Sequence, residues 1–320
     1  MVNVLLSIIV PVYRNEESIP DLIAALAAIN HRAKCDFNCS IEVVFVVDGS
    51  PDNSYSVLEQ LLPSTPFASQ LLQHSRNFGS FLAIRTGLQV ATGQFFGVLA
   101  ADLQEPPELL LVFLEKLLKN QCDVVIGCRE RRNDPFISRG ASNLFWKFYK
   151  TFVIHEIPEK GVDVFGCNKA FRNQLMLFAE THTSLVGLIF WLGFRRSEVT
   201  YVRRARSHGR SAWTFTAKFN YLLDSVFSFT DLPIKLLSEF GLIGVIASVL
   251  LGIAVILVKM FGDIPVPGYA ATILTIVFFG GLNTLGLGIV GTYAWRAFEN
   301  TKGRPLTVIM NEQKYNGTGC

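Results

Sequence analysis

Two long uncharged stretches near the C-terminal end constrain the fold of this chain most. They run from Phe240 to Val258 and from Tyr269 to Ala294, and neither contains Lys, Arg, Asp or Glu. A helix rises about 1.5 Å per residue, so a helix as long as the first stretch spans roughly 28 Å, close to the hydrocarbon core of a bilayer. The sequence therefore predicts a hairpin of two transmembrane helices, over about 236–258 and 269–294. The alternative is a pair of buried core helices, which are usually shorter.

Basic residues set the expected orientation of this hairpin. A basic run from Arg195 to Lys218 precedes the first stretch, and Arg296, Lys302 and Arg304 follow the second. The segment between the two stretches holds one Lys and one Asp. By the positive-inside rule we expect the main domain and both termini to be cytoplasmic in a multi-pass protein.

The 320 residues divide into four expected parts. We expect a catalytic domain at 1–210 and interfacial amphipathic helices at 211–235, where aromatic residues are frequent. The hairpin takes 236–298 and a cytoplasmic tail takes 299–320.

The six cysteines show no metal-ligand spacing, which favours a reducing compartment over a disulfide scaffold. We also expect no signal peptide, because the first residues lack a basic region.

Strand-like and helix-like patterns alternate through the first 130 residues. Such alternation predicts an α/β fold with a mainly parallel sheet covered by helices. Apolar runs predict strands at 4–12, 41–47, from 71, 95–99 and 123–127, and helical periodicity predicts helices at 19–28, 54–62, 80–91 and 108–119.

Polar residues follow these predicted strands, at the edge where ligands bind in parallel α/β folds. Asp102 and Gln104 come directly after the fourth strand, and their oxygens suit a hard cation such as Mg²⁺ or Mn²⁺. Such a cation would neutralise a diphosphate leaving group. Asp48, after the second strand, fits hydrogen bonding to the edge of a nucleotide base. Each of these residues alone could instead be an ordinary turn residue.

Four motifs occur in a fixed order along this part of the chain. They are Ile9-Val10-Pro11-Val12-Tyr13, Asp48-Gly49-Ser50-x-Asp52, Arg76-Asn77-Phe78-Gly79 and Asp102-Leu103-Gln104-x-Pro106-Pro107-Glu108. Their order resembles the family 2 glycosyltransferases of the GT-A fold. The later Arg203-x-x-Arg206-x-x-Gly209-x-Ser211 narrows the resemblance to the polyprenyl-phosphate glycosyltransferases, and most of all to bactoprenol glucosyltransferase.

The resemblance implies a reaction. A hexose, with glucose as the first candidate, would pass from a UDP-sugar to undecaprenyl phosphate by metal-assisted, inverting transfer. The product would be a lipid-linked sugar of the cell envelope, made at the cytoplasmic face of the bacterial inner membrane. The expected partners are therefore the UDP-sugar, the polyprenyl phosphate and the lipid bilayer, with no nucleic acid. We also expect a homo-oligomer, for which a tetramer is one form.

The resemblance also implies roles for individual residues. Asp163 would act as base or orienter beside the catalytic Asp102, although a loop-capping role for Asp163 is the alternative. Ala100 stands where relatives commonly carry an Asp, so diphosphate oxygens and water would complete the metal shell. Donor binding would fall to Pro11, Tyr13, Glu16, Asp48, Asp52, Arg76, Asp102 and Gln104, metal binding to Asp102 and Gln104, and phosphate or acceptor binding to Arg129, Arg139, Arg203, Arg206 and Ser211.

Two other classes of function stay open at this point. A processive polysaccharide synthase would share the donor motifs, but two spans are too few to enclose a channel in one subunit. A membrane-tethered protein that binds nucleotide sugars without turnover is the other class, and Ala100 gives it some support. Incorporation of sugar into lipid, into polymer or into neither separates the three.

Overall fold

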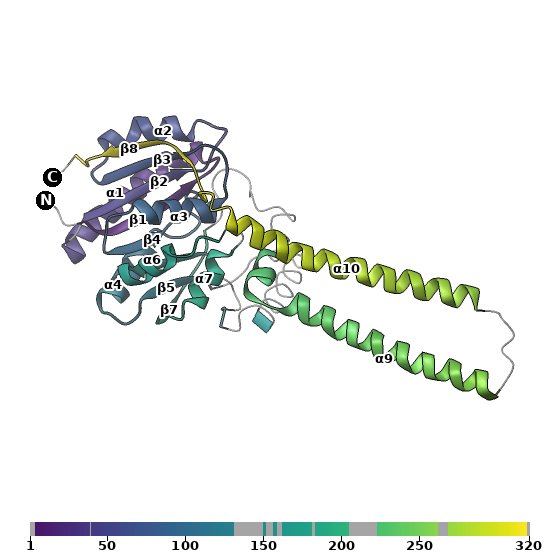
Figure 1. Ribbon diagram of the computed structural model, residues 1–320. Helices are drawn as coiled ribbons and strands as arrows, with labels where there is room; N and C mark the ends of the chain where they lie inside the picture. Colours follow the sequence, from purple (N-terminus) through teal and green to yellow (C-terminus); the bar gives the residue numbers. More distant parts are fainter. Residues whose placement is uncertain are drawn as a thin grey trace. The chain divides into compact units, whose positions relative to one another are not determined.

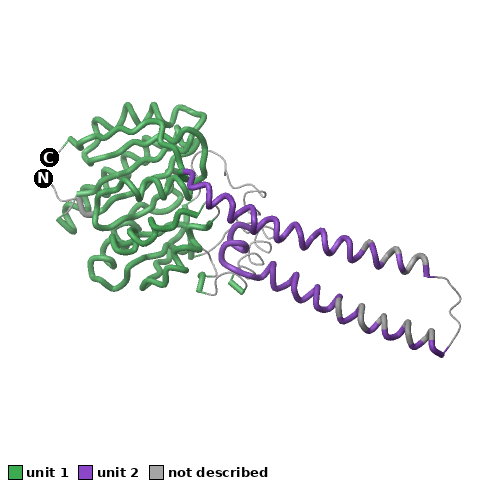
Figure 2. The backbone as a smooth tube through the Cα atoms, viewed as in Figure 1, with its two compact units in different colours: residues 1–219, 305–320 green, residues 220–304 purple. Residues whose placement is uncertain are grey.

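The computed structural model describes residues 4–38, 40–130, 150–151, 156–158, 162–180, 183–204, 223–261 and 268–318. The predicted site residues Arg139, Arg206 and Ser211 lie outside these ranges. The chain forms two compact units, coloured separately in Figure 2. Unit 1 holds residues Met1–Phe219 and Pro305–Cys320, and unit 2 holds Asn220–Arg304.

Unit 1 is built on an eight-stranded sheet with the order β7-β5-β6-β4-β1-β2-β3-β8. Strands β1 to β4 run parallel, β7 runs parallel to β5, and only β6 and β8 among the described strands pair antiparallel to their neighbours. The expected mainly parallel α/β sheet is thus confirmed. The strands are β1 (Val4–Val12), β2 (Ser40–Val47), β3 (Ala68–His74), β4 (Phe95–Val98), β5 (Val124–Arg129), β6 (Val164–Asn168), β7 (Arg196–Tyr201) and β8 (Ile309–Tyr315).

Helices connect these strands and cover the sheet (Figure 1). The first helix continues well past the predicted 19–28 and ends at Phe37. The next residue, Asn38, caps the last turn with its left-handed φ of 51° and its backbone N–H. The helices of unit 1 are α1 (Ile19–Phe37), α2 (Ser54–Leu61), α3 (Ser80–Val90), α4 (Leu109–Leu118), α6 (Lys169–Met176) and α7 (Leu185–Trp191), with short 3-10 turns at Glu16–Ser18 and Leu62–Ser64.

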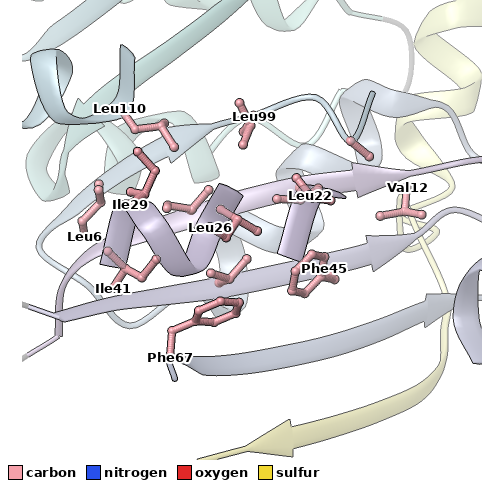
Figure 3. Packing of buried hydrophobic residues seen from close by; sticks show 14 of the residues in the cluster. Leu6, Val12, Leu22, Leu26, Ile29, Ile41, Phe45, Phe67, Leu99 and Leu110 are labelled. Carbon is pink, nitrogen blue, oxygen red and sulfur yellow. The ribbon is translucent and has the colours of Figure 1, made fainter. Parts of the chain in front are cut away.

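The main core lies between α1 and the central strands (Figure 3). Leu22, Leu26 and Ile29 recur at helical spacing, so they share one face of α1, and all three are buried. They belong to the same cluster as Phe45 of β2. On α3, a Cβ at Gly87 would lie 2.5 Å from Ile9 Cγ2 of β1, so α3 packs closely on the sheet. Helices thus bury the central strands. The carboxyl ends of these strands stay available for a site.

The C-terminal tail differs from the expected separate segment at 299–320. Its residues 305–320 belong to unit 1, where β8 pairs antiparallel with β3. The pairing places Leu71 opposite Gln313 and His74 opposite Ile309. Most side chains of β8 are exposed, as is usual for an edge strand, so the sequence offers no apolar run that would predict it.

Unit 2 contains two long helices, α9 (Leu232–Phe261) and α10 (Tyr269–Thr301). Both uncharged stretches fall within these helices. Over the part of the chain that the structure describes, however, no helix has a stretch long and apolar enough to cross a membrane. The expected two-span transmembrane hairpin is therefore not supported. Of the described residues in the expected interfacial segment at 211–235, 223–229 are helical and 232–235 form the start of α9.

Candidate functional site

The candidate site lies along the carboxyl edge of the sheet in unit 1. Tyr13 directly follows β1, Asp48 directly follows β2, and Asp102 lies just beyond β4. These three strands run parallel. Chain order reverses at β1, because β2 and β3 extend to one side of it and β4 lies on the other. Open α/β sheets bind ligands at such a switch point. The fold thus places the predicted donor residues where a ligand crevice is expected.

Asp48 is buried and binds a neighbouring loop of its own chain. Its Oδ1 accepts a hydrogen bond from Phe78 N at 2.9 Å, and its Oδ2 accepts one from Gly79 N at 2.7 Å. A third bond joins Oδ1 to His74 Nδ1 at 2.8 Å. Asp48 therefore fixes the Arg76-Asn77-Phe78-Gly79 loop in this structure, while its contact with a nucleotide base stays a prediction.

The turn after β2 presses directly against this same loop. Gly49 has φ +57°, and a Cβ there would lie 2.2 Å from the carbonyl carbon of Arg76. Only glycine combines this φ with so close an approach. The Arg76 side chain itself is exposed, with its guanidinium carbon 4.1 Å from the centre of the Phe78 ring. Arg76 is thus held at its backbone and open to a ligand at its side chain.

Asp52 and Glu16 tie the loop after β1 to the start of α2. Asp52 accepts hydrogen bonds from the hydroxyls of Ser50 and Ser54 at 2.6 and 2.9 Å and from Glu16 N at 3.2 Å. Burial alone would raise the pKa of Asp52, but these hydrogen bonds outweigh it and lower the pKa below its ordinary value. Glu16 in turn accepts from the backbone and side-chain nitrogens of Asn53 at 3.0 and 3.1 Å. Both acids bind protein groups here, and their contacts with a nucleotide-sugar donor stay predictions.

A charged cluster lies farther along the edge, at the ends of β4, β5 and β7. Arg129 donates to both oxygens of Asp163, with Nε to Oδ2 at 2.5 Å and Nη2 to Oδ1 at 2.7 Å. The Tyr201 hydroxyl donates to Asp163 Oδ2 at 2.7 Å. Arg203 Nη2 donates to Gln104 Oε1 at 2.5 Å. The structure thus brings together five predicted residues, which are Asp102, Gln104, Arg129, Asp163 and Arg203.

Glu105 and Tyr201 belong to this cluster and were not predicted. Glu105 is 3% exposed, and Arg203 Nε lies 3.4 Å from its Oε1. Burial raises the pKa of Glu105 to about 7, against the opposing effect of Arg203 and with the help of Asp102 and Asp163. Burial, followed by Asp163, raises the pKa of Tyr201, so its phenol stays a hydrogen-bond donor. The position of Glu105 inside the Asp102 motif was a signal that could have identified it.

The backbone between Asp102 and Gln104 adopts a left-handed conformation. Leu103 has φ 52°, which a branched L-residue rarely adopts and which costs about 1–3 kcal/mol. Gln104 N donates to Asp102 Oδ1 at 3.3 Å across this turn. Arg14, which follows Tyr13 at the end of β1, has φ 57°. Strained residues of this kind cluster at functional sites, and both lie at the predicted edge.

Asp102 and Gln104 supply the oxygen ligands that a hard divalent cation prefers. Among the described residues, no group of three or more His, Cys, Asp or Glu side chains could hold a metal ion. The expectation that substrate oxygens and water complete the shell of a cation here stays a prediction. Gln104 Oε1 accepts from Arg203 in this structure, and its second lone pair is the one that a cation would use.

Comparison with known proteins finds similar glycosyltransferases. Residues 7–177 match the family described as Glycosyl transferase family 2. The chain is 32% identical to a putative glycosyltransferase, CsbB, of Bacillus subtilis over 95% of this chain and 91% of that protein. It is 30% identical to an uncharacterised glycosyltransferase, sll0501, of Synechocystis over 95% and 94% of the two chains. It is 29% identical to the bactoprenol glucosyl transferase of Shigella phage SfV over 97% and 99%.

Proposed function

The chain belongs to glycosyl transferase family 2, and from this premise we propose that it transfers a hexose from a UDP-sugar to a polyprenyl phosphate. Glucose is the first candidate, because several similar relatives are named as bactoprenol glucosyl transferases. We place the reaction at the surface of the bacterial inner membrane, on its cytoplasmic side, since the hydrocarbon tail of the acceptor stays in a bilayer. A homo-oligomer stays a prediction.

The charged cluster is the observation that carries this proposal. Arg129 and Arg203 are partly buried, with side chains 19% and 29% exposed, and both lie at the carboxyl edge near Asp102. A guanidinium group donates paired hydrogen bonds to phosphate oxygens, and partial burial strengthens them. Two such groups suit a reaction that brings a donor diphosphate and an acceptor phosphate together.

The chemistry of the acceptor reduces the need for a general base. A phosphate monoester has a second pKa of about 6, so it is largely dianionic at pH 7 and already nucleophilic. The protein must then offset repulsion between two anions and align the attacking oxygen. A bound Mg²⁺ or Mn²⁺ would supply further neutralisation of the donor diphosphate.

The bonds of Asp163 support a positioning role. Its two oxygens accept from Arg129 and Tyr201 in this structure, which fixes the direction of the Arg129 guanidinium group. Asp163 therefore orients Arg129 toward the substrates, and the proposed mechanism takes no proton through Asp163. Tyr201 binds the same carboxylate from the end of β7, the strand that pairs with the Arg129 strand β5.

Release of UDP from UDP-glucose tests this proposal, with undecaprenyl phosphate compared against undecaprenol as acceptors. We expect release to require the phosphate, because the acceptor oxygen belongs to that group. Arg203→Lys keeps the charge but loses the forked geometry, so it should raise the KM for the acceptor or the donor. Equal release with both lipids, or growth of a sugar polymer, would contradict the proposed reaction.

A further inference from the structure

A buried chain of hydrogen bonds joins Asp48 to the C-terminal tail. His74 Nδ1 lies 2.8 Å from Asp48 Oδ1, and His74 Nε2 lies 3.0 Å from Thr86 Oγ1. Thr86 Oγ1 lies 2.9 Å from the hydroxyl of Thr307, which is 221 residues away in the sequence. Asp48, His74 and Thr86 are each at most 3% exposed. Thr307 itself is half-buried, so the hydrogen bonds are shielded from water most strongly between Asp48 and Thr86.

The backbone of the tail is held at a fixed point beside these hydrogen bonds. Val308 O accepts a hydrogen bond from Ser75 N at 3.0 Å, and Ile309 pairs with His74 in the sheet. Thr307 is therefore held beside Thr86 by the backbone on its C-terminal side. All of these residues belong to unit 1.

The other end of the chain of hydrogen bonds is the predicted donor loop. Asp48 accepts from Phe78 N and Gly79 N, and the His74 ring meets the Phe78 ring edge to face at 5.4 Å. The Arg76 guanidinium group lies over the same Phe78 ring. The orientation of His74 thus bears directly on the position of this loop.

The positions of the protons decide which group donates and which accepts in each of these hydrogen bonds. If Asp48 is ionised and His74 is neutral, Nδ1 of His74 carries the proton and its Nε2 accepts from the Thr86 hydroxyl. The Thr86 oxygen can then accept from the hydroxyl of Thr307. Removing the Thr307 hydroxyl leaves the Thr86 oxygen short of a donor and weakens its hold on the imidazole.

We propose that Thr307 is a positioning residue for the donor pocket, acting through Thr86, His74 and Asp48 on the Arg76–Gly79 loop. The functional part of this inference rests on the proposed use of that loop for a nucleotide sugar. The coupling between Thr307 and the loop does not depend on it. The tail would then contribute to donor affinity as well as completing the sheet.

Three full-length variants test the proposal. Thr307→Val removes the hydroxyl at nearly constant shape, and Thr307→Ser retains it. Thr318→Val is the matched control, because the Thr318 hydroxyl donates to Thr65 O at the far end of the same tail, at 3.1 Å. The measurements are UDP affinity by calorimetry, donor KM and kcat, and hydrogen exchange of the Phe78 and Gly79 amides without nucleotide.

We expect Thr307→Val to weaken UDP binding and raise the donor KM by about three- to tenfold, the effect of one net hydrogen bond, with kcat nearly unchanged. Exchange at Phe78 and Gly79 should become faster, Thr307→Ser should restore wild-type behaviour, and Thr318→Val should match wild type. Unchanged exchange in Thr307→Val, equal effects of Thr307→Val and Thr318→Val, or failure of the serine rescue would overturn the proposal.

UDP binding and amide exchange together separate this inference from the proposed function. If the wild-type protein binds no UDP, the proposed donor is wrong. Amide exchange then still decides whether Thr307 positions the loop. If UDP binds equally to wild type and Thr307→Val, the donor assignment stands and the role of Thr307 is wrong.

Discussion

Individual residues at the carboxyl edge have two kinds of role. Asp48, Asp52 and Glu16 bind neighbouring loops of the protein through their oxygens. Arg76 is exposed, and Arg129 and Arg203 are partly exposed beside the acidic groups. The acids that follow the first two strands thus build the loops, and the arginines are the groups that we propose as donors to phosphate.

At the residue scale, Arg203→Ala should damage catalysis more than Asp163→Asn. Losing charge-assisted hydrogen bonds to phosphate should lower kcat/KM by about 10- to 100-fold. Asp163→Asn should lower it by about tenfold at most, because asparagine still accepts from Arg129 and no proton must be abstracted. Steady-state kinetics on both variants provides the comparison.

Arg195→Ala is the control for these kinetics. Arg195 pairs with Asp123 on an exposed surface just before β7, away from the carboxyl edge, and its loss should leave kcat/KM unchanged. An Asp163→Asn enzyme that binds donor normally but has no turnover would instead identify Asp163 as the base.

Asp52 makes a pH-dependent contribution to stability. Its folded pKa lies below the unfolded value of about 3.8, so the stabilisation is fully present above pH 4 and is lost as pH falls through the folded pKa. Asp52→Asn should lower the free energy of unfolding by about 0.5–1 kcal/mol at pH 7, after allowance for solvent screening. Denaturant unfolding between pH 3 and 7 measures this, and the difference from wild type should shrink below pH 4.

Asp36→Asn provides the comparison for Asp52. Asp36 forms an exposed ion pair with Arg32 at 3.9 Å, which contributes little to stability. Its substitution should change the unfolding free energy by less than about 0.5 kcal/mol at every pH. A constant deficit of Asp52→Asn down to pH 3 would show that its hydrogen bonds do not depend on charge.

At the scale of elements, periodicity predicted the first five strands and the four helices between them. These elements are buried on one or both faces, so apolar spacing records their contacts. Sequence reasoning missed β8 because an exposed edge strand carries no such pattern. The two long C-terminal helices were located, yet their predicted membrane spans are not supported among the described residues.

The turn between β2 and α2 gives a prediction at this scale. Gly49→Ala adds both a strained φ and a clash with the Arg76 backbone, so it should lower the free energy of unfolding by about 2–4 kcal/mol and weaken UDP binding. Gly193→Ala separates the two effects, because Gly193 has φ +68° but a Cβ added there would meet no atom within 4 Å. Gly193→Ala should lower the free energy of unfolding by about 1–2 kcal/mol, the cost of the backbone strain alone. Both variants are measured by thermal and denaturant unfolding. Equal losses of stability in Gly49→Ala and Gly193→Ala would refute the clash.

For the whole molecule, the sheet brings together residues that are far apart in the sequence. Parallel strands place Asp102, Arg129 and Tyr201 at one edge, and antiparallel β6 places Asp163 there from its N-terminal end. Motifs could predict Asp102, Asp163 and Arg203, but not the partner of each. Those partners depend on strand order, which the sequence pattern alone does not reveal.

The tail supplies β8, the last strand at one edge of this sheet, and its removal should show what that strand contributes. A chain ending at Arg304 loses β8 and exposes the backbone of β3, so we expect lower thermal stability and association through the open edge. A chain ending at Thr318 retains the strand and should behave as wild type. Thermal unfolding and size-exclusion chromatography measure both. A monodisperse, equally stable chain ending at Arg304 would show that β8 does not protect the sheet.

The central claim is glycosyl transfer to a lipid phosphate. Its most direct test uses the purified full-length protein with undecaprenyl phosphate, Mg²⁺ or Mn²⁺ and a panel of radiolabelled nucleotide sugars, followed by organic extraction. We predict that label enters the lipid phase with one donor, first of all UDP-glucose, and that Arg203→Ala greatly reduces it. Nucleotide-sugar binding without label in the lipid phase, for every donor and either metal, would contradict the account.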